Sequence, residues 1–316
     1  SACLVGSEMC IRDRFKDLLY GFYEDTIKAI RSVDERHIVV YMPPWGNDMS
    51  VVRRIDASNV VFSTHLYTGG TWDGTTGYTV DKAELERDML RGYRQAVEEW
   101  NIPLWIGEFG VGSAAYRAQE WASDMLSLID KYMLGSAWWS YWRDDSSFGL
   151  LYENGSEKRA LIDILDRAYP QACSIPPSSF SYDLPNRFFS LVTSQPPEPV
   201  SFSLTLHIPP GLKEDRVVFC NATEWNSSWS PKSHTLLITA TPESFSVAVQ
   251  LSPPPGAYLE RLKSLEQESA TLRAQAKSLS QTALAFEALA AILALAFAVS
   301  IVQRARKSRR ARSPPV

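Results

Sequence analysis

Apolar runs alternate with amphipathic stretches between residues 14 and 170. Apolar residues recur at helical spacing over 18–33, and helices are also expected over 82–100, 114–133 and 158–169. Short, continuous apolar runs of strand length lie between them, at 37–42, 59–65, 102–108 and 135–142. Continuous apolar strands that alternate with helices are typical of a parallel sheet covered by helices. The pattern therefore predicts an α/β fold, the C-terminal half of a (β/α)8 TIM barrel.

A different pattern, strict alternation of apolar and polar residues, appears in the segment 179–252. Every second residue from Val200 to Ile208 is apolar, which is the period of a half-buried strand. Further short apolar runs, separated by Pro- and Ser-rich turns, indicate that the whole segment consists of β-strands. We expect a small β-sandwich domain here, joined to the barrel by a linker over residues 171–178.

The C-terminal segment has the pattern of a membrane anchor. Residues 253–282 contain a Pro-rich turn and then a heptad repeat of apolar and small residues, which predicts a helical stalk. Residues 283–302 are apolar apart from Glu287 and are long enough to span a bilayer. The basic tail, 303–316, marks the cytoplasmic side. We therefore expect a single-pass membrane protein whose residues before 283 lie outside the cytoplasm. The stalk could form an oligomer, and a lone helix fits it equally well.

Composition narrows the class of partner and cofactor. The net charge is −4, and six basic residues lie in the last 13 positions, so the body that precedes them is more acidic still. An acidic body argues against nucleic acid as the main partner. Four Cys without a CxxC motif or a His/Cys cluster predict no metal site, and no cofactor is expected. The chain contains ten Trp residues, a high number, and the apolar faces of ligands often stack against such flat rings.

The first residues differ from all that follows. Residues 1–13 have neither a helical nor a strand period, and they resemble a translated sequencing adapter. We expect them to be foreign sequence that precedes the C-terminal portion of a longer protein. A natural polar N-terminus is the alternative. The absence of a signal peptide agrees with the first interpretation.

Polar and aromatic residues end the predicted barrel strands, where βα loops converge and catalytic groups are found. The second strand ends in His65 and Tyr67, the third in Glu108, and the fourth contains Trp138 and Trp139. The carboxylate of Glu108 lies at a strand end between two glycines, and Tyr67 of the neighbouring strand could orient it by a hydrogen bond. This arrangement suits the nucleophile of a glycosidase. A Trp that faces the barrel mouth would offer a platform for a sugar ring.

Structural roles are the alternative for each of these residues. Glu108 could instead pair with a rim arginine such as Arg53 or Arg143, and His65 could be a core histidine with its hydrogen bonds satisfied. The two tryptophans could belong to the core. Alternation places them on opposite sides of their strand, but it does not say which one faces the mouth.

The order of these motifs, HLY at 65–67, then IGEFG at 106–110, then a Trp-rich strand, resembles the second half of glycoside hydrolase family 5. The segment 165–172 (LDRAYPQA) resembles the barrel-ending Arg-Pro-Tyr-Pro signature of its endoglycoceramidase-like group, with Ala168 in place of the first Pro. Phe180-Ser-Tyr-Asp183 then resembles the start of that group's C-terminal β-sandwich.

The resemblance implies specific roles. Glu108 becomes the nucleophile, His65 and Tyr67 become active-site contacts, and Trp138 or Trp139 becomes the sugar platform. The family's acid/base is a Glu in an Asn-Glu-Pro step, and no such step occurs in this chain. Glu8, upstream, lies within the suspected foreign stretch. We therefore expect the full-length parent to be a retaining β-glycosidase and the chain as written to be inactive.

The predicted anchor and the subgroup together favour a glycolipid headgroup, such as that of a glycosylceramide, as substrate. An endo-β-glucanase, a glucosylceramidase or a steryl-glucosidase relative remains open, because loops set the headgroup length. A non-catalytic, membrane-anchored carbohydrate-binding protein is the alternative of a different class. Cys173 and Cys220 could form a disulfide in an oxidising compartment, and two free thiols are equally compatible with the fold.

Overall fold

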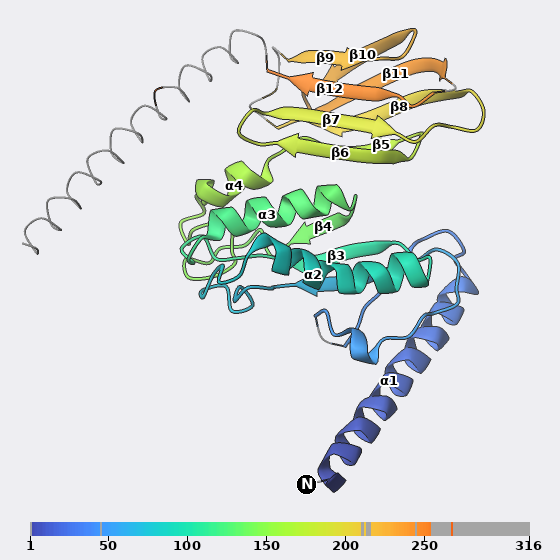
Figure 1. The fold of residues 1–316 in the computed structure, drawn as a ribbon, viewed down its shortest axis with the longest axis vertical. Helices are drawn as coiled ribbons and strands as arrows, with labels where there is room; N and C mark the ends of the chain where they lie inside the picture. The colour runs from blue at the N-terminus through green and yellow to red at the C-terminus, as the bar shows by residue number, and fades with distance from the viewer. Residues whose placement is uncertain are drawn as a thin grey trace, which may run out of the picture. The chain divides into compact units, whose positions relative to one another are not determined.

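The computed structural model describes residues 2–253 except 45, 210, 211, 213–215 and 244, together with residue 267, and it describes side chains from residue 14 onwards (Figure 1). The predicted membrane span and basic tail lie outside these residues, as does the predicted stalk apart from positions 253 and 267. Within the described part of the chain, no helix combines the length and the apolar character needed to cross a bilayer.

The parallel α/β arrangement predicted for the first part of the chain is confirmed. Four parallel strands pair in chain order: β1 (Val39–Tyr41), β2 (Val60–Leu66), β3 (Leu104–Phe109) and β4 (Gly135–Trp138). The helices are α1 (Ala2–Arg31), α2 (Lys82–Tyr93), its π-helical continuation (Arg94–Glu99), α3 (Ala118–Lys131) and α4 (Arg159–Leu165), with a 3-10 turn at Met49–Val51. Consecutive parallel strands with intervening helices are the repeating unit of a TIM barrel.

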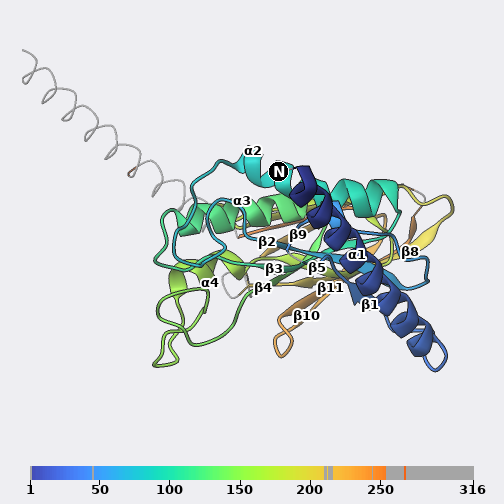
Figure 2. The same ribbon diagram turned by 90° about the horizontal axis from the view of Figure 1, so that it is seen from below.

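Helices α2 and α3 lie against this sheet (Figures 1 and 2), and one hydrophobic cluster joins the sheet to its helices. Phe62 and Ile106 from the strands and Trp121 from α3 are fully buried in it. The apolar runs seen in the sequence thus face the helices, and this packing fixes the strands whose carboxyl ends carry the polar residues.

Two predicted boundaries of this region were wrong. The helix expected from Leu18 begins at Ala2 instead, and residues 2–13 contain no Pro that would interrupt it. The fourth strand ends at Trp138 rather than at 142. Beyond it the backbone pairs with its own loop, since the Leu150 amide donates to the Ser140 carbonyl at 3.1 Å and the Leu151 amide to the Trp142 carbonyl at 3.0 Å.

The rest of the described chain forms two four-stranded antiparallel sheets. One has the order β10-β11-β8-β5 and the other β6-β7-β12-β9. Their bounds are β5 (Tyr169–Cys173), β6 (Pro177–Asp183), β7 (Phe188–Thr193), β8 (Val200–His207), β9 (Val217–Cys220), β10 (Trp225–Ser230), β11 (Thr235–Glu243) and β12 (Ala248–Ser252). Both sheets contribute to one buried cluster, with Phe202 and Leu204 from one and Phe189 and Val249 from the other.

Strands begin earlier here than the sequence pattern predicts. The stretch 171–178 was expected to be a linker, but β5 and the start of β6 occupy much of it. The last barrel helix ends at Leu165 instead of reaching Tyr169, because Pro170 cannot continue a helix and Tyr169–Cys173 pairs with β8 instead.

Cys173 and Cys220 are both free thiols in the structure, so the disulfide considered from the sequence is not formed. Cys173 lies in β5, next to β6, whereas Cys220 lies in β9, which is at the other end of the sheet from β6. Their positions at opposite ends of the two sheets explain why the thiols do not pair.

Candidate active site

Glu108 lies at the carboxyl end of β3. Two side chains contact its carboxylate, one from β2 and one from the residue directly after β2. The Tyr67 hydroxyl donates a hydrogen bond to Glu108 Oε2 at 2.9 Å, and His65 Nδ1 lies 3.2 Å from the same oxygen. No donor among the described residues contacts Oε1. The Glu108 side chain is 27% exposed, so this second oxygen can reach a ligand. The structure thus brings together the three residues that the sequence singled out.

The register of the two strands produces this cluster. His65 pairs directly with Glu108, just after a shift in register between Thr64 and His65. Gly107 makes the approach possible, because a Cβ there would collide with the Ser63 hydroxyl and lie 3.2 Å from His65 Nε2. The glycine before the carboxylate therefore allows close packing with β2, where a larger residue would push the imidazole away.

The surroundings of Tyr67 keep its hydroxyl in place as a hydrogen-bond donor to Glu108. Its ring packs edge-on against Phe148, with ring centroids 5.3 Å apart. Burial, with a further contribution from the hydrogen bond and the charge of Glu108, raises the pKa of the Tyr67 phenol well above its usual value of 10. The phenol therefore stays protonated and remains a donor to Glu108 over the whole physiological pH range. Phe148 was not anticipated, because it lies in the loop after β4, far in sequence from the Tyr67 ring that it contacts.

The two tryptophans at the end of β4 differ in their surroundings. Trp138 packs against Phe109 of β3 and Trp121 of α3, with ring centroids 5.2 and 6.2 Å away, so it belongs to the helix-side core. Trp139 comes directly after the end of β4 and is 50% exposed. Of the two candidates for a sugar platform, Trp139 is therefore the one with the more accessible ring.

The alternative in which Glu108 forms a rim ion pair is not observed. Arg53 instead contacts Glu24 at 3.1 Å and Asp17 at 3.8 Å, and the Arg143 guanidinium lies beside Gly155. Within the described residues, the partners of Glu108 are a phenol and an imidazole, with no guanidinium. Its charge is therefore oriented without being neutralised by a permanent cation.

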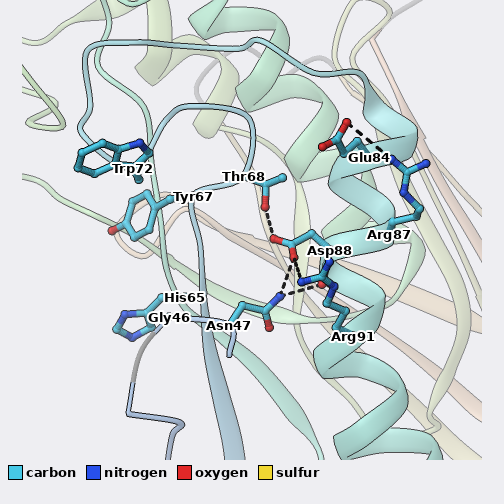
Figure 3. A pocket seen from close by; sticks show the side chains of 10 residues that line it. All are labelled: Gly46, Asn47, His65, Tyr67, Thr68, Trp72, Glu84, Arg87, Asp88 and Arg91. Carbon is cyan, nitrogen blue, oxygen red and sulfur yellow. Dashed lines mark hydrogen bonds and ion pairs between the residues drawn. The ribbon is translucent and has the colours of Figure 1, made fainter. Parts of the chain in front are cut away.

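A cavity of about 500 Å³ opens from this cluster toward α2 (Figure 3). It is lined by Gly46, Asn47, His65, Tyr67, Thr68, Trp72, Glu84, Arg87, Asp88 and Arg91. Sequence reasoning missed every one of these except His65 and Tyr67, although the 84, 87, 88, 91 spacing does indicate one face of a helix. Across the described residues, no group of three or more His, Cys, Asp or Glu side chains is arranged to hold a metal ion.

Comparison with known proteins agrees with the motif-based resemblance. Residues 12–145 match the family model described as Cellulase (glycosyl hydrolase family 5). An endoglucanase from Bacillus sp. (strain KSM-635) is 26% identical over 125 residues, which cover 38% of this chain and 13% of that protein. The similarity to glycoside hydrolase family 5 predicted from the sequence is therefore confirmed.

Solved structures of endo-glycoceramidase II from Rhodococcus sp. share the fold. The lactosyl-enzyme intermediate matches with a TM-score of 0.60 at 20% identity, covering 74% of this chain and 53% of that one. The complex with a cellobiose-like imidazole gives a TM-score of 0.62, and the ganglioside GM3 complex gives 0.61, each at 19% identity over 74% of this chain and 53% of that chain. The chain thus spans about half the length of these structures.

Proposed function

We propose that the protein is a retaining β-glycosidase of the family 5 type and that Glu108 is its nucleophile. The observation that carries this proposal is the carboxylate at the end of β3, with Oε2 held by Tyr67 and His65 and Oε1 left without a donor. The family match over residues 12–145 supports the same reaction class.

The chemistry follows from this geometry. Glu108 Oε1 attacks the anomeric carbon of a β-glycoside, and the bond from that carbon to the leaving oxygen breaks with its electron pair. Water then attacks the anomeric carbon and loses a proton to the solvent, while the bond between that carbon and Glu108 Oε1 breaks and its electron pair returns to the carboxylate. The free sugar keeps its β configuration. Tyr67 stabilises the carboxylate at the start and the end of this cycle, while Trp139 offers a flat surface to the sugar ring.

A second carboxyl group is required for natural substrates, whose leaving oxygen must be protonated. The retaining mechanism places that group roughly 5–5.5 Å from the nucleophile. The Asn-Glu-Pro step that carries it in family 5 does not occur in this sequence. We therefore propose that this chain cleaves only glycosides with leaving groups that depart without a proton, such as dinitrophenolate.

Turnover of 2,4-dinitrophenyl β-cellobioside by the full chain tests the proposal. We expect slow release of dinitrophenolate, faster release in the presence of azide, and β-cellobiosyl azide as the product, since azide needs no general base to attack the glycosyl-enzyme. Glu108→Gln should remove this activity, whereas the exposed Glu153→Gln should retain it. Sugar binding without any Glu108-dependent turnover would instead identify a non-catalytic carbohydrate-binding protein.

For the substrate we propose a glycolipid headgroup. The support is the fold shared with an endo-glycoceramidase and the apolar segment 283–302, which would keep the enzyme at the bilayer where such headgroups lie. Lyso-lactosylceramide and cellotetraose, added as competitors of the dinitrophenyl substrate, separate this from a glucanase. Stronger inhibition by the lyso-lipid supports a glycolipid substrate, and stronger inhibition by cellotetraose supports an endo-β-glucanase.

We further propose that residues 253–302 form a stalk and a single membrane span, with the catalytic region outside the cytoplasm, and that the two antiparallel sheets are a β-sandwich domain that orients the barrel. The support for the span is its apolar length followed at once by the basic tail. Alkaline carbonate extraction of membranes from expressing cells tests it. The full chain should remain with the membranes, and release into the supernatant would contradict the anchor.

A further inference from the structure

A buried lysine lies between the loop after β4 and the start of α4. Lys158, the residue directly before α4, is only 1% exposed. Its ammonium group donates a short hydrogen bond to the backbone carbonyl of Asp144 and lies 5.7 Å from the centre of the Tyr152 ring. Lysine is almost never fully buried unless its charge is compensated, because an ammonium group loses its hydration there. An apolar side chain would fill the same space without that cost, so the hydrogen bond of Lys158 needs an explanation.

Lys158 holds the segment 144–150, which we call the anchored segment, at both of its ends. The ammonium group binds the carbonyl of Asp144 at the first end, and the Lys158 amide donates to the Leu150 carbonyl at 2.9 Å at the other. Between these points the Asp144 carboxylate accepts a hydrogen bond from the Ser147 amide at 3.0 Å. The course of the anchored segment is therefore fixed by one side chain and by its own turn.

Phe148 projects from the anchored segment toward the proposed site. A Cβ atom would lie 3.0 Å from the Phe148 ring if it were added at Gly74, after β2, and 3.2 Å if it were added at Gly110, after β3. Because neither residue has a side chain, the ring can lie close to both loops and still reach Tyr67. The two ring centroids are 5.3 Å apart. The position of the anchored segment thus decides how closely Phe148 packs against Tyr67.

This packing bears on the proposed chemistry through the Tyr67 hydroxyl. That hydroxyl donates to Glu108 Oε2 at 2.9 Å, and the bond requires the phenol ring to keep one orientation. The Phe148 ring, packed edge-on against the phenol, restricts its rotation. A displacement of about 1 Å in groups that position a reaction can cost a hundredfold in rate. Loss of the anchor at Asp144 would therefore reach the carboxylate through two rings.

We infer that Lys158 is a positioning residue: its hydrogen bond to the anchored segment keeps Phe148 packed against Tyr67. Tyr67 in turn orients the carboxylate of Glu108. This inference rests on the proposed function and extends it to a buried lysine that lies outside the cluster at the strand ends.

NMR of the full chain labelled at tyrosine Cζ tests the inference without requiring turnover. The Tyr67 resonance is identified by its absence from Tyr67→Phe, and its change on Glu108→Gln reports the hydrogen bond between these two residues. We expect Lys158→Met to remove most of that change. Lys131→Met is the matched control, because Lys131 also binds an oxygen, Glu86 Oε1, and lies 5.3 Å from an aromatic ring. It should keep the full change.

Turnover of 2,4-dinitrophenyl β-cellobioside per folded molecule is the second measurement. Lys158→Met should lower kcat roughly tenfold, the lower end of the effect of losing a hydrogen bond to a charged group. In the Tyr67→Phe background, which already lacks that hydrogen bond, Lys158→Met should have little further effect. A merely structural role would lower turnover by the same factor in both backgrounds.

Thermal melting shows whether each variant is folded, and Lys158→Gln takes the place of Lys158→Met if the latter does not melt cooperatively. A folded variant that keeps the full change of the Tyr67 resonance, or an equal loss of kcat in both backgrounds, would overturn the inference. The two proposals fail in different ways. Turnover that depends on Glu108, with an unaltered Tyr67 response in Lys158→Met, rejects the positioning role alone. A lost Tyr67 response without any turnover by the parent chain rejects the nucleophile alone.

Discussion

Two carboxylates of this protein, Asp130 and Glu108, have opposite surroundings. Asp130, on α3, forms a short ion pair with Arg167, and the two side chains are only 6% and 8% exposed. Glu108 is more accessible, at 27%, and its partners are the uncharged Tyr67 phenol and the His65 imidazole. Burial raises the pKa of Asp130 to about 6 even though Arg167 acts to lower it.

The difference agrees with a structural role for Asp130 and with the catalytic role proposed for Glu108. Asp130 and Arg167 are each the other's charge partner in a site closed to water, so neither can be removed without leaving a buried, unpaired charge. Glu108 has donors on one oxygen only, and its side chain is partly exposed, so its other oxygen is accessible to a ligand. The variants below test this contrast, from the largest expected effect to the smallest.

Glu108→Gln should affect chemistry and leave stability nearly unchanged. Loss of the nucleophile should lower turnover of 2,4-dinitrophenyl β-cellobioside by at least about a thousandfold. Because the amide preserves the shape of a partly exposed side chain, the free energy of unfolding should change by less than about 1 kcal/mol. Initial rates and urea denaturation measure the two effects. A large loss of stability with retained turnover would contradict the proposal and would assign a structural role to Glu108.

Arg167→Leu should give the opposite result. Removing one member of a buried ion pair should lower the free energy of unfolding by about 3–5 kcal/mol, because Asp130 is left without its cation. Urea denaturation measures this loss, and the Asp130→Asn, Arg167→Leu double variant should recover part of it. If the single variant were as stable as the parent, the pair would not be a structural support. Turnover per folded molecule should stay the same.

Tyr67→Phe should give an intermediate effect confined to chemistry. A hydrogen bond to a charged group contributes about 1.5–3 kcal/mol, so turnover should fall by roughly 10- to 100-fold. Stability should change little, since the ring and its contact with Phe148 remain. Phe148→Tyr is a control that keeps a ring against Tyr67. Unchanged turnover in Tyr67→Phe would show that Glu108 does not need this donor.

The smallest effect concerns pH. The pKa of Tyr67 is higher in the folded protein than in the unfolded chain. The contribution of Tyr67 to the free energy of unfolding is therefore fully present below pH 10, and it is lost only as the pH rises through the folded-state pKa. NMR of protein labelled at tyrosine Cζ should show that the Tyr67 resonance does not titrate by pH 10. In Glu108→Gln the pKa should move back toward its usual value. Titration of Tyr67 near pH 10 in the parent chain would contradict this environment.

The strand-tip cluster could be predicted from the sequence because it depends on local pattern alone. Parallel strands end at the same edge of a sheet, so His65, Tyr67 and Glu108 had to lie near one another. The choice between Trp138 and Trp139 as sugar platform could not be made from the sequence, because only the contact with Trp121 shows that Trp138 belongs to the core.

Features that depend on contacts between residues far apart in the sequence were also missed, because the local sequence does not indicate such contacts. The cavity requires Asn47 and Thr68 to meet Asp88 on α2, and nothing in the local sequence indicates those partners. The strand at Tyr169–Cys173 forms only because β8 is there to pair with it. Helix formation over residues 2–13 went undetected because these residues lack the helical spacing of apolar positions that served as the signal.

The central claim is that Glu108 forms a covalent bond to the sugar. The most direct test is incubation of the full chain with 2,4-dinitrophenyl 2-deoxy-2-fluoro-β-cellobioside, followed by mass spectrometry of the intact protein and its peptides. The account predicts the addition of one fluorocellobiosyl group, located on the peptide that contains Glu108 and absent from Glu108→Gln. A group attached to another residue, or no addition while the sugar still binds, would contradict it.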